Sequence, residues 1–156
     1  MSVVSLSTQS RRIAGILLIT IVTIEFGGYY LTRVASGAVE LTEFQQNFAR
    51  AGHAHAGVLV ILSLVGVLLA DAGGVYGRLG LVARLAIPLA AILMSAGFFV
   101  SSMGQGRTEP NGLIVVLWLG AASLTVGVLS LGIGLLRGGT GAPRQPAGRE
   151  LSGSPG

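Results

Sequence analysis

The chain has 156 residues, of which 51% are hydrophobic and only 10% are charged. Soluble domains carry about 25% charged residues, so this composition excludes a disordered chain, a nucleic-acid-binding domain with a basic surface and an ordinary soluble enzyme. The sequence contains no cysteine, which excludes disulfides, thiolate-bound metals and cysteine nucleophiles. We therefore expect an integral membrane protein that contacts the lipid bilayer and has no nucleic-acid partner.

Four apolar runs are long enough to cross a bilayer, which requires about 20 residues per helix. They cover Ile13–Val34, Ala51–Ala70, Leu79–Met103 and Gly112–Leu136. We expect an all-α fold, a four-helix transmembrane bundle that forms one domain over residues 13–136, after an N-terminal segment of residues 1–12. Residues 137–156 are rich in Gly, Pro, Ser and Arg, a composition that predicts a disordered tail.

The arginines are distributed unevenly between the two sides of this predicted bundle. A cytoplasmic N-terminus would place seven on the cytoplasmic side and three outside; the outer ones are Arg33, Arg50 and Arg107. Cytoplasmic segments of membrane proteins carry the excess of basic residues. We therefore expect a multi-pass protein of the cell membrane with its N-terminal segment and its C-terminal tail in the cytoplasm.

The first run has a competing interpretation as a cleaved signal peptide. Arg11 and Arg12 would be its basic region, and Val34, Ala35 and Ser36 resemble a cleavage site. The run is longer than the about 7–15 apolar residues of a signal peptide, and it contains Glu25. The transmembrane interpretation is therefore favoured.

Small or polar residues align along one face of each predicted span, and on the first span the face expected to turn inward carries Glu25, Gly28 and Tyr29. On the fourth span they are Gly120, Ser123, Gly127, Ser130 and Gly134. Helices in lipid pack closely through such residues, so these faces predict the interior of a compact bundle. The stripe on the fourth span could equally be the surface for a second copy or for another membrane protein.

The second helix is expected to begin outside the bilayer. Thr42 followed by Gln45 fits a capping box, so the helix would run from there to about Ala70. At its other end, Asp71 forms a charge group with Arg78 and Arg84, which we expect to anchor the following loop.

Three ionisable residues inside or beside the spans are candidates for function, because charges within a membrane are costly and rare. They are Glu25, His53 and His55. The two histidines are about 200° apart on a helix, so they cannot both point at one site. Measured from the small face of the second span, His55 is expected to point inward, near Glu25 and Tyr29, whereas His53 is expected to reach the headgroups or a loop.

A site of Glu25 and His55, with His53 as a further candidate and Tyr29 as a hydrogen-bonding neighbour, would bind a divalent metal or haem or relay protons. The alternative is a hydrogen bond between Glu25 and His55 or Tyr29 that fixes the helix register. Because both histidines lie on one predicted helix, haem would need a different second ligand or a dimer. No recognisable hydrolytic motif is present.

The stretch Phe48–Gly57, with the sequence FARAGHAHAG, resembles small four-helix membrane proteins of bacteria. Heavy use of Ala, Gly, Val and Arg without Lys is also typical of a GC-rich bacterium. The His-x-His pair is similar to that of haem-copper oxidase-related and NnrS-like membrane proteins. Those families place further histidines on other helices, whereas this chain has two in all, so the resemblance transfers no function.

Three functions follow from these observations. The first is a non-enzymatic membrane subunit, assembly factor or interaction protein, because small-residue faces are abundant and reactive groups are few. The second is a metal- or haem-associated redox or sensing module that uses Glu25 and His55. The third is a small proton-linked carrier, which would need an oligomer to enclose a path.

Overall fold

The computed structural model describes residues 5–138, and this part of the chain forms four α-helices and no strand. They are α1 (Thr8–Ala35), α2 (Glu43–Ala72), α3 (Gly77–Ser101) and α4 (Ile114–Leu136). Each is long and apolar enough to cross a membrane, so the chain is a multi-pass membrane protein of the expected all-α class. Residues 139–156, which make up most of the predicted tail, lie outside the described residues, as do residues 1–4.

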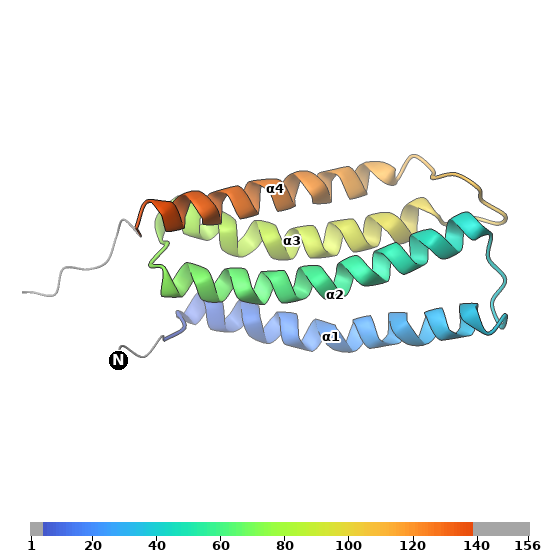
Figure 1. The fold of residues 1–156 in the computed structure, drawn as a ribbon, viewed down its shortest axis with the longest axis horizontal. Helices are drawn as coiled ribbons and strands as arrows, with labels where there is room; N and C mark the ends of the chain where they lie inside the picture. Colours follow the sequence, from blue (N-terminus) through green and yellow to red (C-terminus); the bar gives the residue numbers. More distant parts are fainter. Residues whose placement is uncertain (1–4, 139–156) are drawn as a thin grey trace, which may run out of the picture.

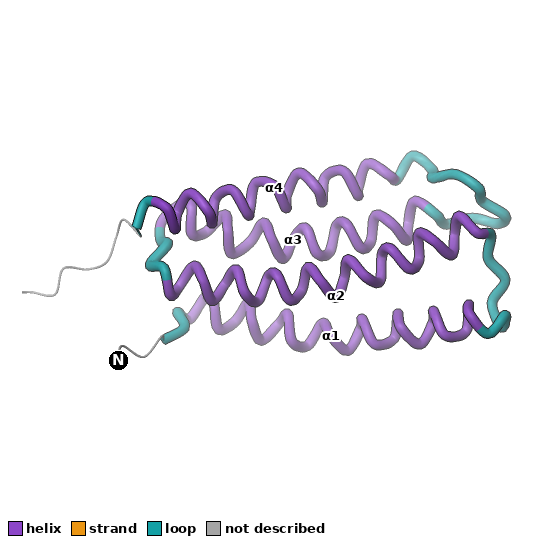
Figure 2. Tube along the Cα trace, in the orientation of Figure 1, coloured by secondary structure: helices purple, strands orange, loops and turns teal. Residues whose placement is uncertain are grey.

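Successive helices run in opposite directions, so the start of α1 and the end of α4 lie at the same end of the bundle (Figure 1). We call this end the inner end, following the orientation predicted from the arginines. A short turn connects α2 to α3 there, whereas longer loops connect the other helices at the outer end (Figure 2).

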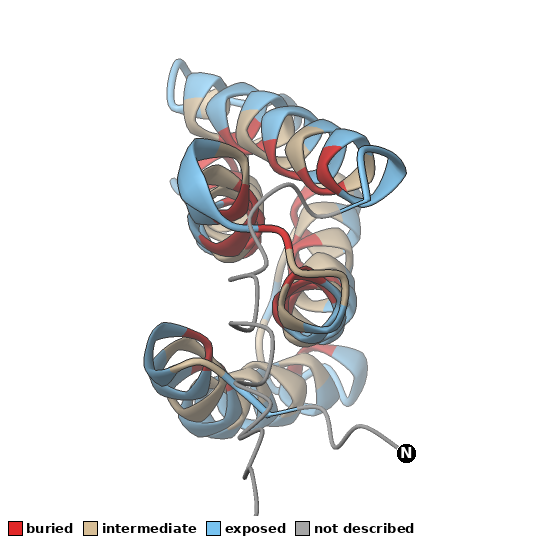
Figure 3. Ribbon diagram, turned by 90° about the vertical axis from the view of Figure 1, so that its left-hand side faces the viewer, coloured by how far each residue is buried: buried red, intermediate tan, exposed pale blue. Residues whose placement is uncertain are grey.

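The helices do not surround a common axis equally. In the end-on view α3 lies between α2 and α4, while α1 lies apart from α4 and packs mainly on α2 (Figure 3). In the most apolar stretch of α1 only 6% of the residues are buried, compared with 33% in the corresponding stretches of α2 and α3. α1 is therefore a peripheral helix, and most of its surface faces lipid.

Glycines allow α3 and α4 to approach closely. A Cβ atom added to Gly97 would lie 2.5 Å from the backbone nitrogen of Leu117, and one added to Gly120 would lie 2.6 Å from the backbone nitrogen of Met94. Ser123 also donates a hydrogen bond of 2.9 Å to the carbonyl of Ala86. The small face of α4, which the sequence offered as a possible partner surface, is therefore covered by α3 of the same chain.

The capping box predicted at the start of α2 is present. Thr42 Oγ1 accepts from the backbone nitrogen of Gln45 at 3.2 Å, and Gln45 Oε1 accepts from the backbone nitrogen of Thr42 at 3.3 Å. The amide of Gln45 also donates to the carbonyls of Ser102 and Gly104, at 2.9 and 2.8 Å. These bonds tie the start of α2 to the end of α3.

The inner end is held by a buried ion pair, which confirms Asp71 as an anchoring residue. Arg84 of α3 lies 2.5 Å from Asp71 of α2, and their side chains are 4% and 2% exposed. Arg84 also donates to Ser10 Oγ of α1 at 3.0 Å and to the carbonyl of Val75 at 2.8 Å. Arg78, the third member of the expected charge group, is exposed.

α1 begins before the apolar run that starts at Ile13. The helix begins at Thr8, and Ser7 caps it by accepting from the backbone nitrogen of Ser10. Ser7 also donates its own backbone N–H to Asp71 at 2.7 Å. Arg11 and Arg12 consequently lie within the first turns of α1, where both side chains are exposed.

Candidate functional site

Glu25 lies on the outward side of α1, where its side chain is exposed. It borders a shallow hollow with Val22, Phe26 and Tyr29, all of them from α1. Glu25 is about 15 Å from the end of the helix at Ala35, at about 1.5 Å per residue. α1 has 28 residues, a length of about 42 Å, so a hydrocarbon core of about 30 Å centred on this helix would include the carboxyl group.

Glu25 has no partner among the residues that the structure describes. Between residues 5 and 138, its carboxyl group takes part in no hydrogen bond or ion pair. Its neighbours Phe26 and Tyr29 are 71% and 63% exposed. The hollow is therefore open to whatever surrounds α1 in the membrane.

His53 points from α2 toward α1. A Cβ added to Gly27 would lie 3.2 Å from Nδ1 of His53, and one added to Gly28 would lie 3.4 Å from its Cε1. The two consecutive glycines of α1 therefore leave the space that the imidazole ring occupies. His53 is partly buried at this helix interface and does not extend into a loop.

His55 lies on a different side of α2 and packs against α3. Its ring centroid is 4.9 Å from that of Phe98. Nδ1 lies 2.8 Å from the carbonyl oxygen of Ala51, and because a carbonyl only accepts, this nitrogen carries the hydrogen. The bond to its own helix holds the ring in place beside Phe98.

His55 points into the bundle as expected, but toward α3 and not toward Glu25, and His53 meets α1 where the headgroups or a loop were expected. The expectation treated α2 as having one inward face, centred on Gly52. In the structure α2 lies between α1 and α3, so it has two packed faces. Gly52 faces Phe99 of α3, so the direction taken as inward leads to α3, whereas His53 is the histidine that meets α1.

The predicted constellation is not assembled. Glu25 faces away from the bundle, His53 meets the glycines of α1 and His55 meets Phe98. Over the described residues, no three His, Cys, Asp or Glu side chains are grouped so that they could hold a metal ion. Tyr29 lies beside Glu25 on α1. Among the described residues, it forms no hydrogen bond with either histidine.

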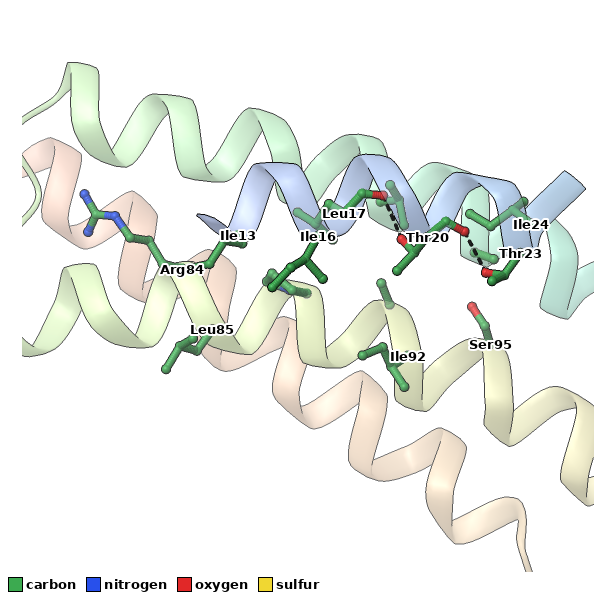
Figure 4. A pocket seen from close by; sticks show the side chains of 14 residues that line it. Ile13, Ile16, Leu17, Thr20, Thr23, Ile24, Arg84, Leu85, Ile92 and Ser95 are labelled. Carbon is green, nitrogen blue, oxygen red and sulfur yellow. Dashed lines mark hydrogen bonds between the residues drawn. The ribbon is translucent and has the colours of Figure 1, made fainter. Parts of the chain in front are cut away.

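A groove between α1 and α3 escaped the sequence analysis. It has a volume of about 400 Å³, and its lining is almost entirely apolar. Its lining also includes Ala56 and Val60 of α2. Ile16 and Ile92 line its walls, and Arg84 and Ser95 mark its two ends (Figure 4). The sequence shows no sign of it, because these residues look like ordinary core or lipid-facing positions.

Comparison of the chain with protein-family models, with curated proteins and with solved structures found no match.

Proposed function

We propose that the protein is a non-enzymatic subunit or interaction protein of the cell membrane, with its N-terminal segment and its tail in the cytoplasm, and that it binds a second transmembrane helix through the outward face of α1. The observation that carries this proposal is the exposure of Glu25 at membrane depth. The face consists of Val22, Glu25, Phe26 and Tyr29, and we call it the Glu25 face.

The proposal follows from the energetic cost of an acidic side chain in lipid. On the translocon scale an ionisable residue at a helix centre costs about 2.5–3.5 kcal/mol, and such residues almost always face a bundle interior or a polar cavity. Among the described residues, Glu25 faces neither of these. A hydrogen-bond donor on a neighbouring helix would offset this cost.

The placement of α1 supports the same conclusion. α1 is the least buried of the described helices, and the side opposite α2 is available along its length (Figure 3). Phe26 and Tyr29 provide large apolar area beside the carboxyl group, as is common at the centre of protein interfaces.

A second copy of this chain satisfies these requirements by itself. Tyr29 lies about one helical turn from Glu25, and its hydroxyl group is a donor. A symmetric pair of α1 helices would place the same residues on both sides. Each Tyr29 would then be available to the Glu25 of the other copy.

The test uses the absence of cysteine from the sequence, which makes any introduced cysteine unique. Val22→Cys is labelled with a benzophenone maleimide in native membranes, and the adducts formed under light are separated by mass. Val126→Cys is the matched control, because Val126 is also exposed but lies on α4. We expect a discrete protein adduct from position 22 only, at twice the mass of the chain if the partner is a second copy.

Variants of the carboxyl group complete the experiment. Glu25→Leu should abolish the adduct, whereas Glu25→Gln, which keeps a hydrogen-bonding group, should retain part of it. Glu40→Gln removes the same charge from a loop residue and should have no effect. Equal adducts at positions 22 and 126, or none at position 22, would refute the proposal.

A further inference from the structure

The groove between α1 and α3 lies on the other side of α1 from the Glu25 face. Ile16, on a groove wall, is about 180° from Glu25 around the helix. The groove is open along one side, and Ile16 and Ile92 at this opening are both exposed. Within the bilayer, an apolar groove of this kind is filled either by the acyl chain of a lipid or by side chains of another protein.

The dimensions favour a single lipid chain. The wall from Ile13 to Ile24 is about 16 Å long at about 1.5 Å per residue, which is half of the about 30 Å hydrocarbon core. At the inner end, α1 and α3 are joined by the 3.0 Å hydrogen bond from Arg84 to Ser10. The walls are therefore too close there for a whole helix, which needs about 8–10 Å from each neighbouring axis.

The polar groups at the inner end identify the headgroup. The guanidinium of Arg84 is turned away from the groove (Figure 4) and is engaged by Asp71. Two other arginines flank this end and are exposed: Arg12 and Arg78. Arg12 lies about one turn before Ile16 on α1, and Arg78 lies about two turns before Leu85 on α3, so each continues a wall of the groove.

Neither of these arginines is paired with a carboxylate within residues 5–138. Basic residues between transmembrane helices on the cytoplasmic side bind anionic lipid headgroups. We propose that the groove binds an anionic phospholipid of the inner leaflet, with one acyl chain between α1 and α3 and the phosphate between Arg12 and Arg78.

The far end of the groove provides an internal control. Ser95 lines this end, and its hydroxyl is buried with no hydrogen-bond partner among the described residues. The nearby Thr20 and Thr23 donate to their own helix, at 2.7 and 2.6 Å. A phospholipid chain would reach Ser95 only with its apolar end, so the hydroxyl should not contribute to binding.

The experiment measures lipid retention by native mass spectrometry. The purified full chain is exchanged into vesicles of phosphatidylcholine and phosphatidylglycerol, and the preference for phosphatidylglycerol is determined. Arg12→Gln with Arg78→Gln should lower this preference by about fivefold per arginine. The matched control, Arg33→Gln with Arg50→Gln, removes two exposed arginines from the outer end and should leave it unchanged.

Filling the groove tests the acyl chain separately. A phosphatidylglycerol with a diazirine in its acyl chain should cross-link to Ile16 and Ile92, which line opposite walls. Ala56→Phe should abolish the cross-link, while Ala122→Phe, at an exposed position of α4, should not. The helical content and monodispersity of each variant confirm that it has folded.

Two results would overturn the proposal. One is that the inner and the outer arginine substitutions lower the preference for phosphatidylglycerol equally. The lipid would then be attracted by the net charge of the protein alone. The other is that Ser95→Ala abolishes the cross-link while Arg12→Gln with Arg78→Gln leaves the lipid preference unchanged. The groove would then bind a ligand whose polar group lies near the middle of the bilayer.

Discussion

The imidazole of His53 occupies the space that a side chain on Gly27 would need, since a Cβ there would lie 3.2 Å from Nδ1. This contact joins α2 to α1 in the outer half of the bundle, whereas the hydrogen bonds of Ser7 and Ser10 join α1 to the other helices at the inner end. These contacts lie near the two ends of α1, and between them Leu17 packs in a buried cluster with Leu59, Val60 and Ala91.

Gly27→Leu should displace the ring of His53 and weaken the attachment of α1. Overpacking of this kind costs about 1–3 kcal/mol. Gly15→Leu, on the same helix with nothing within 4 Å of its added Cβ, should be nearly neutral. Unfolding in mixed detergent micelles, followed by circular dichroism, measures both.

The double variant Gly27→Leu/His53→Ala distinguishes this steric effect from a general effect of leucine on α1. Removing the ring leaves room for the new side chain, so the two changes should be non-additive and the double variant more stable than their sum predicts. Strict additivity would show that Gly27 and His53 do not share this space.

Loss of the buried ion pair should be among the most damaging changes in the chain. Arg84→Met leaves Asp71 as an uncompensated buried charge, which costs about 3–5 kcal/mol. Replacing both residues, as in Arg84→Met/Asp71→Leu, removes that charge and should recover part of the loss. Arg33→Met, at an exposed position, should have little effect on the same unfolding curve.

The fold was predictable because membrane spans depend on local properties. Run length and hydropathy place four helices without reference to tertiary contacts. The start of α2 was predictable for the same reason, since Thr42 and Gln45 cap the helix through bonds between neighbouring residues. The start of α1 lies before its apolar run, because Ser7 caps the helix and polar residues form its first turns.

The candidate site could not be predicted in the same way. The sequence places Glu25 and His55 at similar depths in the membrane, and pairing them also requires that α2 has a single inward face. Which face is inward depends on which helices neighbour α2, and hydropathy does not determine this. The lateral position of α1 decides both that His53 meets Gly27 and that Glu25 faces outward.

The outer end should depend on the cap of α2. Thr42→Ala removes the acceptor for the backbone nitrogen of Gln45 and the donor to the carbonyl of Arg107. Losing an N-cap costs about 1 kcal/mol, and the bond to the loop adds to this. Thr42→Ser keeps the hydroxyl and should retain most of the stability. If Thr42→Ser is as damaging as Thr42→Ala, the methyl group and not the cap is responsible.

Because α3 packs closely on α4, alanine substitutions at two glycines should change the stability of the protein in different directions. At Gly97 an added Cβ would lie 2.5 Å from the backbone nitrogen of Leu117, and a backbone atom within a helix cannot move without shifting α4. Gly97→Ala should therefore destabilise the protein by about 1–3 kcal/mol. At Gly132 nothing lies within 4 Å, so Gly132→Ala should be neutral or stabilise by up to about 1 kcal/mol, because alanine restricts the unfolded chain.

Trp118, the only tryptophan in the sequence, lies on α4 and is 64% exposed, so its fluorescence reports directly on this helix. In Gly97→Ala its transition should move to lower denaturant together with the loss of helicity, since α4 is displaced along with its main packing surface. In Gly132→Ala both signals should stay in place or move to higher denaturant. Equal destabilisation by the two substitutions would mean that alanine acts through the helices themselves and that the Gly97–Leu117 approach does not hold α3 and α4 together.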